Sequence, residues 1–529
     1  MPSHAVCMRL CLIAVCAFAA MPAAEVPGEK SRTHIATLIT SFAQKGNTGE
    51  SFCWQASYHL RDFIPGYLAT RDRRWLDQAV QAYDAVVAVM AAGPDGYKGW
   101  VGGAIDGRDV CADVIVGDAI VVNHLLKFAE VVLADAELTT FYGEAARRYI
   151  ALAKHDLIEK WDARGCWHED GPYGAYTQWD IYCTNKEPTV WTRMAFDGNG
   201  VSLPFNKQNS VGECLLKLYR ITGAQPYRDR AQKIYAFMKS RMQLFNDCYV
   251  WNYWEPFGPW DIDLEKKSAA LWMGTHPFRN YQDGEIHQIV EAYNTGVVFD
   301  AQDIQRIINT NLKIMWNQDR EHPQFANSNS QLPINPQTPE QIKALAEEQA
   351  KNAYSKGGKA RAGCLWADLA QFDQTIRDLY AVQLRGHPGI GLDYFSKVTL
   401  SQKPSFVRSH AQFPVTVFER PWNSCLSLSV GAMLPATVSV TKPAIIICKA
   451  SQDIDVVITV VSADGQRTVA QLYADKLPGG KDGRAGVLMF TWDGRDPAVK
   501  SKATLAPGNY RIRWTGPDGY REFPITITE

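Results

Sequence analysis

The sequence lacks several features by which enzyme and binding-protein classes are commonly recognised. It contains no CxxC pair, no HExxH, no GxSxG and no phosphate-binding loop, so it gives no support to a zinc site, a serine hydrolase of the usual type or a nucleotide site. No sign of charge is in excess, because 55 basic and 56 acidic side chains leave a formal net charge of −1. Neither nucleic acid nor an anionic membrane surface is therefore an expected partner.

Long apolar runs are also missing after the N-terminus. Met1 to Ala24 has the pattern of a secretory signal peptide, with Arg9 ahead of the apolar stretch Leu10 to Ala20 and small residues near the expected cleavage point. The apolar stretch is too short to span a bilayer, and no later segment approaches transmembrane length. We therefore expect an exported protein, in the periplasm or outside a bacterial cell.

Cysteines are present but widely spaced. Three of the 12 lie in the signal peptide, and the nine others do not approach the spacing of a zinc site. An odd number leaves at least one thiol free, and Cys166 with Cys183 is a candidate pair that would bridge a loop. We expect neither a metal site nor a cofactor. The pairing of the other cysteines and the oligomeric state do not follow from the sequence.

From residue 31 to about residue 385 the sequence predicts one helical pair after another. Each pair has a short connection containing Gly, Asp or Thr, as antiparallel neighbours require. Repeated hairpins must bury their apolar faces on one another, and about ten such helices fit an (α/α) toroid. The predicted helices are 34–43, 58–69, 74–90, 113–134, 138–161, 209–222, 226–244, 284–293, a helix following Asp300, 339–354 and 366–384.

The segment from Trp272 to Trp316 contains the hairpin with the most suggestive chemistry. Asn294 and Gly296 are expected to end its first helix, and Asp300 with Asp303 forms a capping-box-like start for its second. His287 lies one turn into the first helix, away from the apolar side. The loop before it and the start of that helix are dense in groups that handle protons or anions: His276, Arg279, Tyr281, Asp283 and Glu285.

After about residue 385 helical periodicity stops and short β-branched runs alternate with turns such as Asp464-Gly465. We assign 386–435 to a linker and β-rich connecting segment, and 436–529 to an antiparallel Ig-like β-sandwich. Its expected strands include Val415–Phe418 upstream and six others between 437 and 528. The motifs Trp492–Asp496 and Leu505–Tyr510 resemble those of the Ig-like module of the flagellar hook-capping protein, which implies a fold and no chemistry.

Two long loops are rich in aromatic residues, within a chain that has 16 Trp and 22 Tyr. They run from Gly165 to Tyr176 and from Asp247 to Trp260, and loops of this length inside a compact domain are usually functional. Their rings would either line a sugar-binding groove or plug the ends of the helices. In the first interpretation the substrate-binding residues are Trp251, Trp254, His168, Tyr173 and Tyr176, together with His276 and Arg361 from elsewhere.

An exported helical toroid with aromatic loops suggests a polysaccharide substrate. Cleavage of a uronic-acid polymer by β-elimination requires neutralisation of the uronate carboxylate, a base for the C5 proton and an acid for the leaving oxygen. In Asn209 and His287 the chain resembles the (α/α)-toroid polysaccharide lyases of the alginate and glucuronan type. That resemblance implies that Asn209 and His287 lie near the uronate carboxylate and that a Tyr with a nearby Arg completes the site, either Tyr354 with Arg361 or Tyr281 with Arg279.

Structural roles are the alternative for each of these residues. Asn209 would simply cap its helix, and Arg279 would pair with Asp283. A second enzyme class is glycoside hydrolysis by two carboxylates, for which Glu169 or Asp170 would partner one of Glu255, Asp261 and Asp263. A third interpretation is a non-catalytic glycan-binding protein. Our primary expectation is the lyase.

Overall fold

The structure is a computed structural model, and it describes most of the chain after residue 25. The predicted signal peptide 1–24, the predicted helix 339–354 and the predicted strand Val415–Phe418 lie outside the described residues. The described residues are 26–45, 49–93, 95–103, 111–178, 181–183, 191–192, 200–245, 247–266, 268–271, 279–325, 329, 366–386, 428–450, 453–477, 486–498, 504–516 and 519–529.

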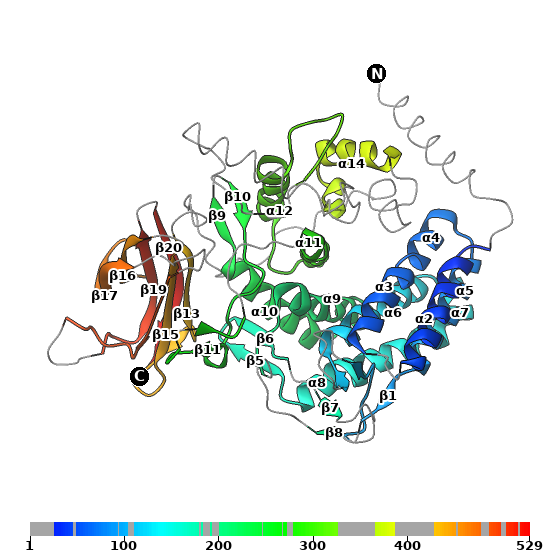
Figure 1. The fold of residues 1–529 in the computed structure, drawn as a ribbon, viewed down its shortest axis with the longest axis horizontal. Helices are drawn as coiled ribbons and strands as arrows, with labels where there is room; N and C mark the ends of the chain where they lie inside the picture. Colours follow the sequence, from blue (N-terminus) through cyan, green and yellow to red (C-terminus); the bar gives the residue numbers. More distant parts are fainter. Residues whose placement is uncertain are drawn as a thin grey trace.

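Paired helices make up the first of two domains (Figure 1). Helices α3, α6, α9 and α11 pack on one another in this order. Helices α7 and α10 pack against their chain neighbours α6 and α9, and α5 packs mainly against α2 and α4. The predicted (α/α) toroid class is confirmed. Within the described residues, no helix has the length and apolar character needed to span a membrane. The bounds are α2 Glu29–Gln44, α3 Glu50–Leu60, α4 Phe63–Thr70, α5 Arg74–Ala88, α6 Ile115–Leu133, α7 Ala136–Leu152, α8 Lys160–Ala163, α9 Phe205–Thr222, α10 Gln225–Arg241, α11 Arg279–Asn294, α12 Ala301–Asn309 and α14 Gln374–Gly386, with π-helical segments Ala153–Glu159 and Thr310–Met315 and the 3-10 helix η6 Ala367–Gln371.

One predicted helix is two helices in the structure. The stretch 58–69 is divided between α3 and α4, because Pro65 has no N–H and is tolerated only in the first turn of a new helix. Gly66 then lets α4 approach α5 closely. A Cβ at Gly66 would lie 2.5 Å from the ring of Trp75, so a side chain there would separate the two helices.

The first helix of the hairpin around His287 ends near the predicted position but begins earlier than predicted. Helix α11 starts at Arg279 and not at Gly284, so Arg279, Tyr281 and Asp283 belong to the helix and not to a preceding loop. Helix α11 ends at Asn294, and Gly296 follows with a left-handed φ of 76°. Helix α12 begins with a reciprocal capping box. The Asp303 N–H donates to the Asp300 carboxylate at 3.0 Å, and the Asp300 N–H donates to the Asp303 carboxylate at 2.8 Å.

The two aromatic loops fold into short β-hairpins beside α9 and α10. The first forms β5 (Trp167–Asp170) with β6 (Tyr173–Tyr176), and the second contains β10 (Cys248–Val250), which pairs with β9 (Gln243–Phe245). The other short strands are β1 Ala91–Ala92, β2 Lys98–Gly99, β3 Gly102–Gly103, β4 Cys111–Asp113, β7 Ile181–Cys183, β8 Trp191–Thr192, β11 Ile262–Asp263 and β12 Ser268–Ala269.

The predicted pair Cys166 and Cys183 is wrong. Cys166 is buried and is not part of a disulfide. Strand β7 instead places Cys183 in register with Cys111 of β4. The sequence spacing alone favoured the loop partner that was nearer in the chain.

The second domain is the predicted β-sandwich. A three-stranded sheet has the order β13-β15-β18, and a five-stranded sheet has the order β14-β20-β19-β16-β17. The β14–β20 pair is parallel, and the expected turn Asp464-Gly465 links β16 to β17, with Gly465 at φ 73°. The domain's first described strand, β13, begins at Leu428, within the stretch 386–435 that the sequence assigned to the connecting segment. Its strands are β13 Leu428–Leu434, β14 Thr437–Val438, β15 Ala444–Ala450, β16 Ile454–Ser462, β17 Thr468–Leu477, β18 Gly486–Trp492, β19 Gly508–Gly516 and β20 Gly519–Ile527.

The capping box gives a direct test of the hairpin. We expect Asp300→Ala to lower the free energy of unfolding by about 1 kcal/mol, because it leaves N–H donors of the first turn of α12 without their acceptor. Urea unfolding monitored by circular dichroism measures the change. The control is Gln302→Ala, an exposed residue of the same first turn. Equal stability of the two variants would contradict the capping role.

Candidate functional site

His287 lies between two buried carboxylates. Its Nε2 is 3.2 Å from Glu213 Oε1 on α9, and its Nδ1 is 3.0 Å from Asp368 Oδ1 on η6. The His287 side chain is 31% exposed, whereas each of the two carboxylate side chains is 8% exposed. An imidazole can donate to acceptors at both nitrogens only in its doubly protonated form, so this arrangement favours an imidazolium that faces solvent on one side.

Glu213 connects this imidazole to the core of the helical domain. It forms an ion pair with Lys217 one turn along α9, and the Lys217 ammonium donates to Asn123 of α6 at 3.0 Å. Burial alone would raise the pKa of Glu213, but Lys217 and His287 hold that pKa well below its usual value. Glu213 is therefore a fixed negative charge, and it orients His287.

A second group of polar side chains lies at the N-terminal ends of the inner helices, and we call it the acidic cluster: Glu50, Lys207, Tyr253, Tyr281 and Glu285. Glu50 of α3 accepts from Lys207 of α9 at 3.2 Å. The rings of Tyr253 and Tyr281 are 6.0 Å apart. Burial raises the pKa of Tyr253, and Tyr281, Glu285 and Glu50 raise it further. Carboxylates from α3 and α11 therefore both lie within electrostatic range of one phenol.

Two indole rings pack beside the acidic cluster. Trp251 donates to the Glu285 carboxylate at 2.7 Å, and its ring lies 5.6 Å from that of Trp366. Trp366 has a φ of 50°, which is rare for a bulky residue and is a strained conformation. It immediately precedes η6, the helix that carries Asp368, so the strain is located next to the His287 partner.

Asn209 does not open its helix and does not contact His287. Helix α9 begins four residues earlier, at Phe205, with Pro204 in the capping position. The Asn209 side chain is fully buried, and its amide lies 2.9 Å from the sulfur of Met238 on α10. The amide that the lyase resemblance assigned to the uronate carboxylate is therefore part of the packing between α9 and α10.

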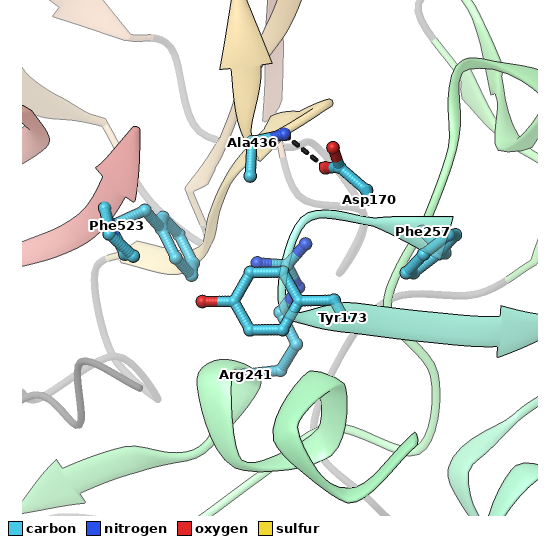
Figure 2. Close-up of a pocket in the computed structure, with 7 residues that line it drawn as sticks. Asp170, Tyr173, Arg241, Phe257, Ala436 and Phe523 are labelled. Carbon is cyan, nitrogen blue, oxygen red and sulfur yellow. Dashed lines mark hydrogen bonds between the residues drawn. The ribbon is translucent and has the colours of Figure 1, made fainter. Parts of the chain in front are cut away.

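Four of the five predicted sugar-binding side chains of the aromatic loops are core residues. Trp251, Trp254, Tyr173 and Tyr176 are between 0% and 4% exposed, so no sugar can stack on them. Trp254 donates to the Ser202 carbonyl oxygen at 2.7 Å. For these residues the loops plug the helix ends, and the groove interpretation is wrong. Tyr173 contributes instead to a pocket between the domains (Figure 2).

His168 is the exception, and it leads to a residue that the sequence prediction missed. Burial lowers the pKa of His168, and its ring lies 4.5 Å from that of Trp260. Trp260 is 44% exposed, although its indole N–H donates to the Ser202 hydroxyl at 3.1 Å. The Trp260 ring also covers Gly258, where a Cβ would approach it to 2.4 Å. Trp260 is thus a fixed, exposed aromatic surface.

The carboxylates first considered for glycoside hydrolysis have structural partners. Glu169 pairs with Lys233, and Asp263 pairs with Lys266. The Asp261 carboxylate accepts hydrogen bonds from the backbone N–H groups of Ser202, Phe257 and Gly258. Glu255 accepts from Asn252 at 2.6 Å. Asp170 accepts from a backbone N–H of the second domain. None of these contacts brings two of the five carboxylates together across a shared site.

For some of the predicted site residues the structure does not describe the side chain. His276, Tyr354 and Arg361 are outside the described residues, and Arg279 is described only as the first residue of α11. Among the side chains that are described, no group of three or more His, Cys, Asp or Glu residues is arranged to hold a metal ion.

The Glu213 network predicts a pH-dependent stability difference. A carboxylate with a depressed pKa stabilises the fold above its unfolded-state pKa of about 4.3, and it loses this effect as the pH falls through the folded-state value. We expect Glu213→Gln to cost about 3 kcal/mol at pH 7, because it leaves Lys217 buried without its partner. Denaturant unfolding at pH 7 and at acidic pH measures the free energy of unfolding of the variant and of the wild type.

The difference in the free energy of unfolding between Glu213→Gln and the wild type should shrink as the pH falls below about 4. Glu144→Gln is the control, since the Glu144 side chain is 89% exposed. A difference that stays constant down to the acid end of the titration would show that the Glu213 charge is not its cause.

No family model matches the sequence, and no curated protein matches it. Among solved structures the chain is similar to the glycoside hydrolase family 76 mannosidase Bt3792 from Bacteroides thetaiotaomicron VPI-5482, at 14% identity and a TM-score of 0.31, over 56% of this chain and 68% of that one. It is also similar to the cellobiose 2-epimerase from Spirochaeta thermophila DSM 6192, at 14% identity and a TM-score of 0.29, over 65% of this chain and 71% of that one. At these scores the two likenesses establish neither a family nor an activity for this chain.

Proposed function

We propose that the protein is an exported carbohydrate-active enzyme that hydrolyses glycosidic bonds, with Glu50 and Glu285 as its paired carboxylates. The observation that supports this proposal is that Glu50, from α3, and Glu285, from α11, both raise the pKa of the Tyr253 phenol, whose ring lies 6.0 Å from that of Tyr281 on the helix that carries Glu285. Both carboxylates are almost fully buried, at 5% and 0% exposure, so the side chains that cover them must move aside before a sugar can reach the two carboxyl groups. Each has a hydrogen-bonding partner that fixes it, Lys207 for Glu50 and Trp251 for Glu285.

Two fixed carboxylates at one site can perform both steps of glycoside hydrolysis. One protonates the oxygen of the leaving sugar, and the other activates water or attacks the anomeric carbon. His287 lies two residues after Glu285 on α11 and makes its contacts with Glu213 and Asp368. We assign it a positioning role, in which it holds α11 against α9 and η6 and places a positive charge beside the site.

Electrostatics favours hydrolysis over β-elimination. A uronate substrate brings its own carboxylate, which a lyase must neutralise before the C5 proton can be removed. The described side chains of this region include the carboxylates Glu50, Glu213, Glu285 and Asp368, and Lys217 is already paired with Glu213. Asn209 is committed to packing against Met238. A neutral sugar chain suits this environment better than an acidic one.

β-Elimination is the second candidate, because Tyr281 is suitably placed for it. Its phenol is half-buried beside Tyr253, at the start of the helix that carries His287. A tyrosine can serve as both base and acid in elimination. Burial raises the pKa of Tyr281, so as a base it would need a cationic neighbour to ionise.

The two reactions give different products from a panel of neutral and uronate-containing polysaccharides. We expect new reducing ends without the ultraviolet absorbance of an unsaturated sugar. Glu50→Gln and Glu285→Gln should each lower kcat by about 100-fold or more while the fold is retained. Glu137→Gln, an exposed residue of α7, is the control. An unsaturated product together with an inactive Tyr281→Phe variant would replace hydrolysis by elimination, and full activity of both glutamine variants would remove the carboxylate assignment.

Trp260 provides a separate prediction about substrate binding. Its fixed indole face can stack on a sugar ring without losing side-chain freedom, so we expect Trp260→Ala to weaken polysaccharide affinity by about tenfold. Affinity electrophoresis in gels containing the polysaccharide measures this change. Phe141→Ala is the control, since Phe141 is 60% exposed on the outer helix α7. Equal loss in both variants would indicate a non-specific effect of exposed rings.

A further inference from the structure

The junction between the helical domain and the β-sandwich contains a buried cation without a partner in contact. Arg241, the last residue of α10, is 5% exposed. Its Nε has no hydrogen-bond partner, and no ion pair joins its guanidinium to any residue in the described part of the chain. Its closest partners are the rings of Phe237 and Phe523, at 5.2 and 4.9 Å from their centroids.

A second unsatisfied donor faces the same pocket. The hydroxyl of Tyr173, on β6, is buried and has no hydrogen-bond partner in the described residues. Ser240 lies nearby, but its hydroxyl donates to the Phe237 carbonyl oxygen at 2.7 Å. Figure 2 shows Tyr173 and Arg241 overlapping in the pocket, with Phe523 of the β-sandwich on one side and Phe257 on the other.

The remaining wall of the pocket is mostly apolar. Ala436, Phe523 and Pro524 belong to the β-sandwich, and Phe257 belongs to the second aromatic loop. Asp170 is the one carboxylate in the lining; it accepts from the Ala436 N–H, and burial raises its pKa. The space between these residues is small, with room for little more than a water-sized group.

The charge on Arg241 requires compensation. A buried cation that is neither paired nor hydrogen-bonded is strongly unfavourable, and burial does lower the pKa of Arg241. Glu255 and Asp170 favour its charged form from a distance, but neither makes a contact with it. A water molecule would accept hydrogen bonds from the N–H donors of Arg241 but would not supply a negative charge. A small anion would supply both the hydrogen-bond acceptor and the negative charge.

We propose that this pocket binds a small monovalent anion no larger than chloride. The Arg241 guanidinium and the Tyr173 hydroxyl donate to it, and the Phe523 and Phe257 rings close the pocket around it. Because Phe523 and Ala436 come from the β-sandwich while Arg241 and Tyr173 come from the helical domain, the bound anion stabilises the docking of one domain on the other. This site is independent of the proposed hydrolytic activity.

The test uses the full-length protein and the thermal unfolding midpoint as the readout. Sodium gluconate, whose anion is too large for the pocket, is replaced stepwise by sodium chloride at constant ionic strength. We expect the midpoint to rise by a few degrees in chloride and to saturate, as binding to the folded state alone requires. An identical midpoint in the two salts would overturn the proposal and leave water as the occupant.

Two variants assign the effect to the pocket. Arg241→Met should abolish the difference between chloride and gluconate, whereas Arg148→Met, at an exposed arginine of α7 that pairs with Asp84, should retain it. Tyr173→Phe keeps the ring and removes one donor, so it should weaken the apparent anion affinity by about tenfold. This variant decides the question if Arg241→Met does not fold. Unchanged anion dependence in Tyr173→Phe and in a folded Arg241→Met would place the anion elsewhere.

Discussion

The buried ion pair of Glu213 and Lys217 on α9 is the interaction on which the arrangement of the helical domain depends most. Lys217 reaches α6 through Asn123, and Glu213 reaches α11 through His287, which in turn holds η6 through Asp368. Three elements that are distant in sequence, α6, α11 and η6, are therefore tied to one turn of α9. Isolated charges are costly in a protein interior, so this network is stable only when all of its members are in place. That condition fixes the register of α9 against both α6 and α11.

The aromatic loops have a different role from the one that their composition first suggested. Trp and Tyr residues suit both a sugar groove and a helix plug, because both need large flat rings with one polar atom. The structure uses most of them as plugs, and the polar atom of each ring then supports a neighbour: Trp251 holds Glu285, and Trp254 holds the backbone at Ser202. Trp260 alone among these loop residues combines a fixed position with substantial exposure.

Sequence reasoning succeeded where the determinants were local. The end of α11, the Asp300–Asp303 capping box and the turn at Gly465 follow from side chains and backbone preferences within a few residues. It failed where the determinants were distant. Asn209 was placed at a helix start because Asn favours that position. The helix in fact starts upstream, at Phe205, with Pro204 in the capping position. Glu50 was missed because nothing near it in the chain indicates that α3 lies opposite α11. The Glu213–Lys217 spacing of four residues was visible as a helical ion pair, but its contact with His287 was not.

The position of Phe523 has a consequence for the synthesis of the chain. The ring of Phe523, on β20, covers Arg241, which is translated much earlier. Until β20 joins the sandwich, the end of α10 is left with an exposed guanidinium and exposed rings beside it. The helical domain thus completes this part of its surface only once the β-sandwich has formed, and a chain that stops short of β20 would present the uncovered patch to the cell's quality-control machinery.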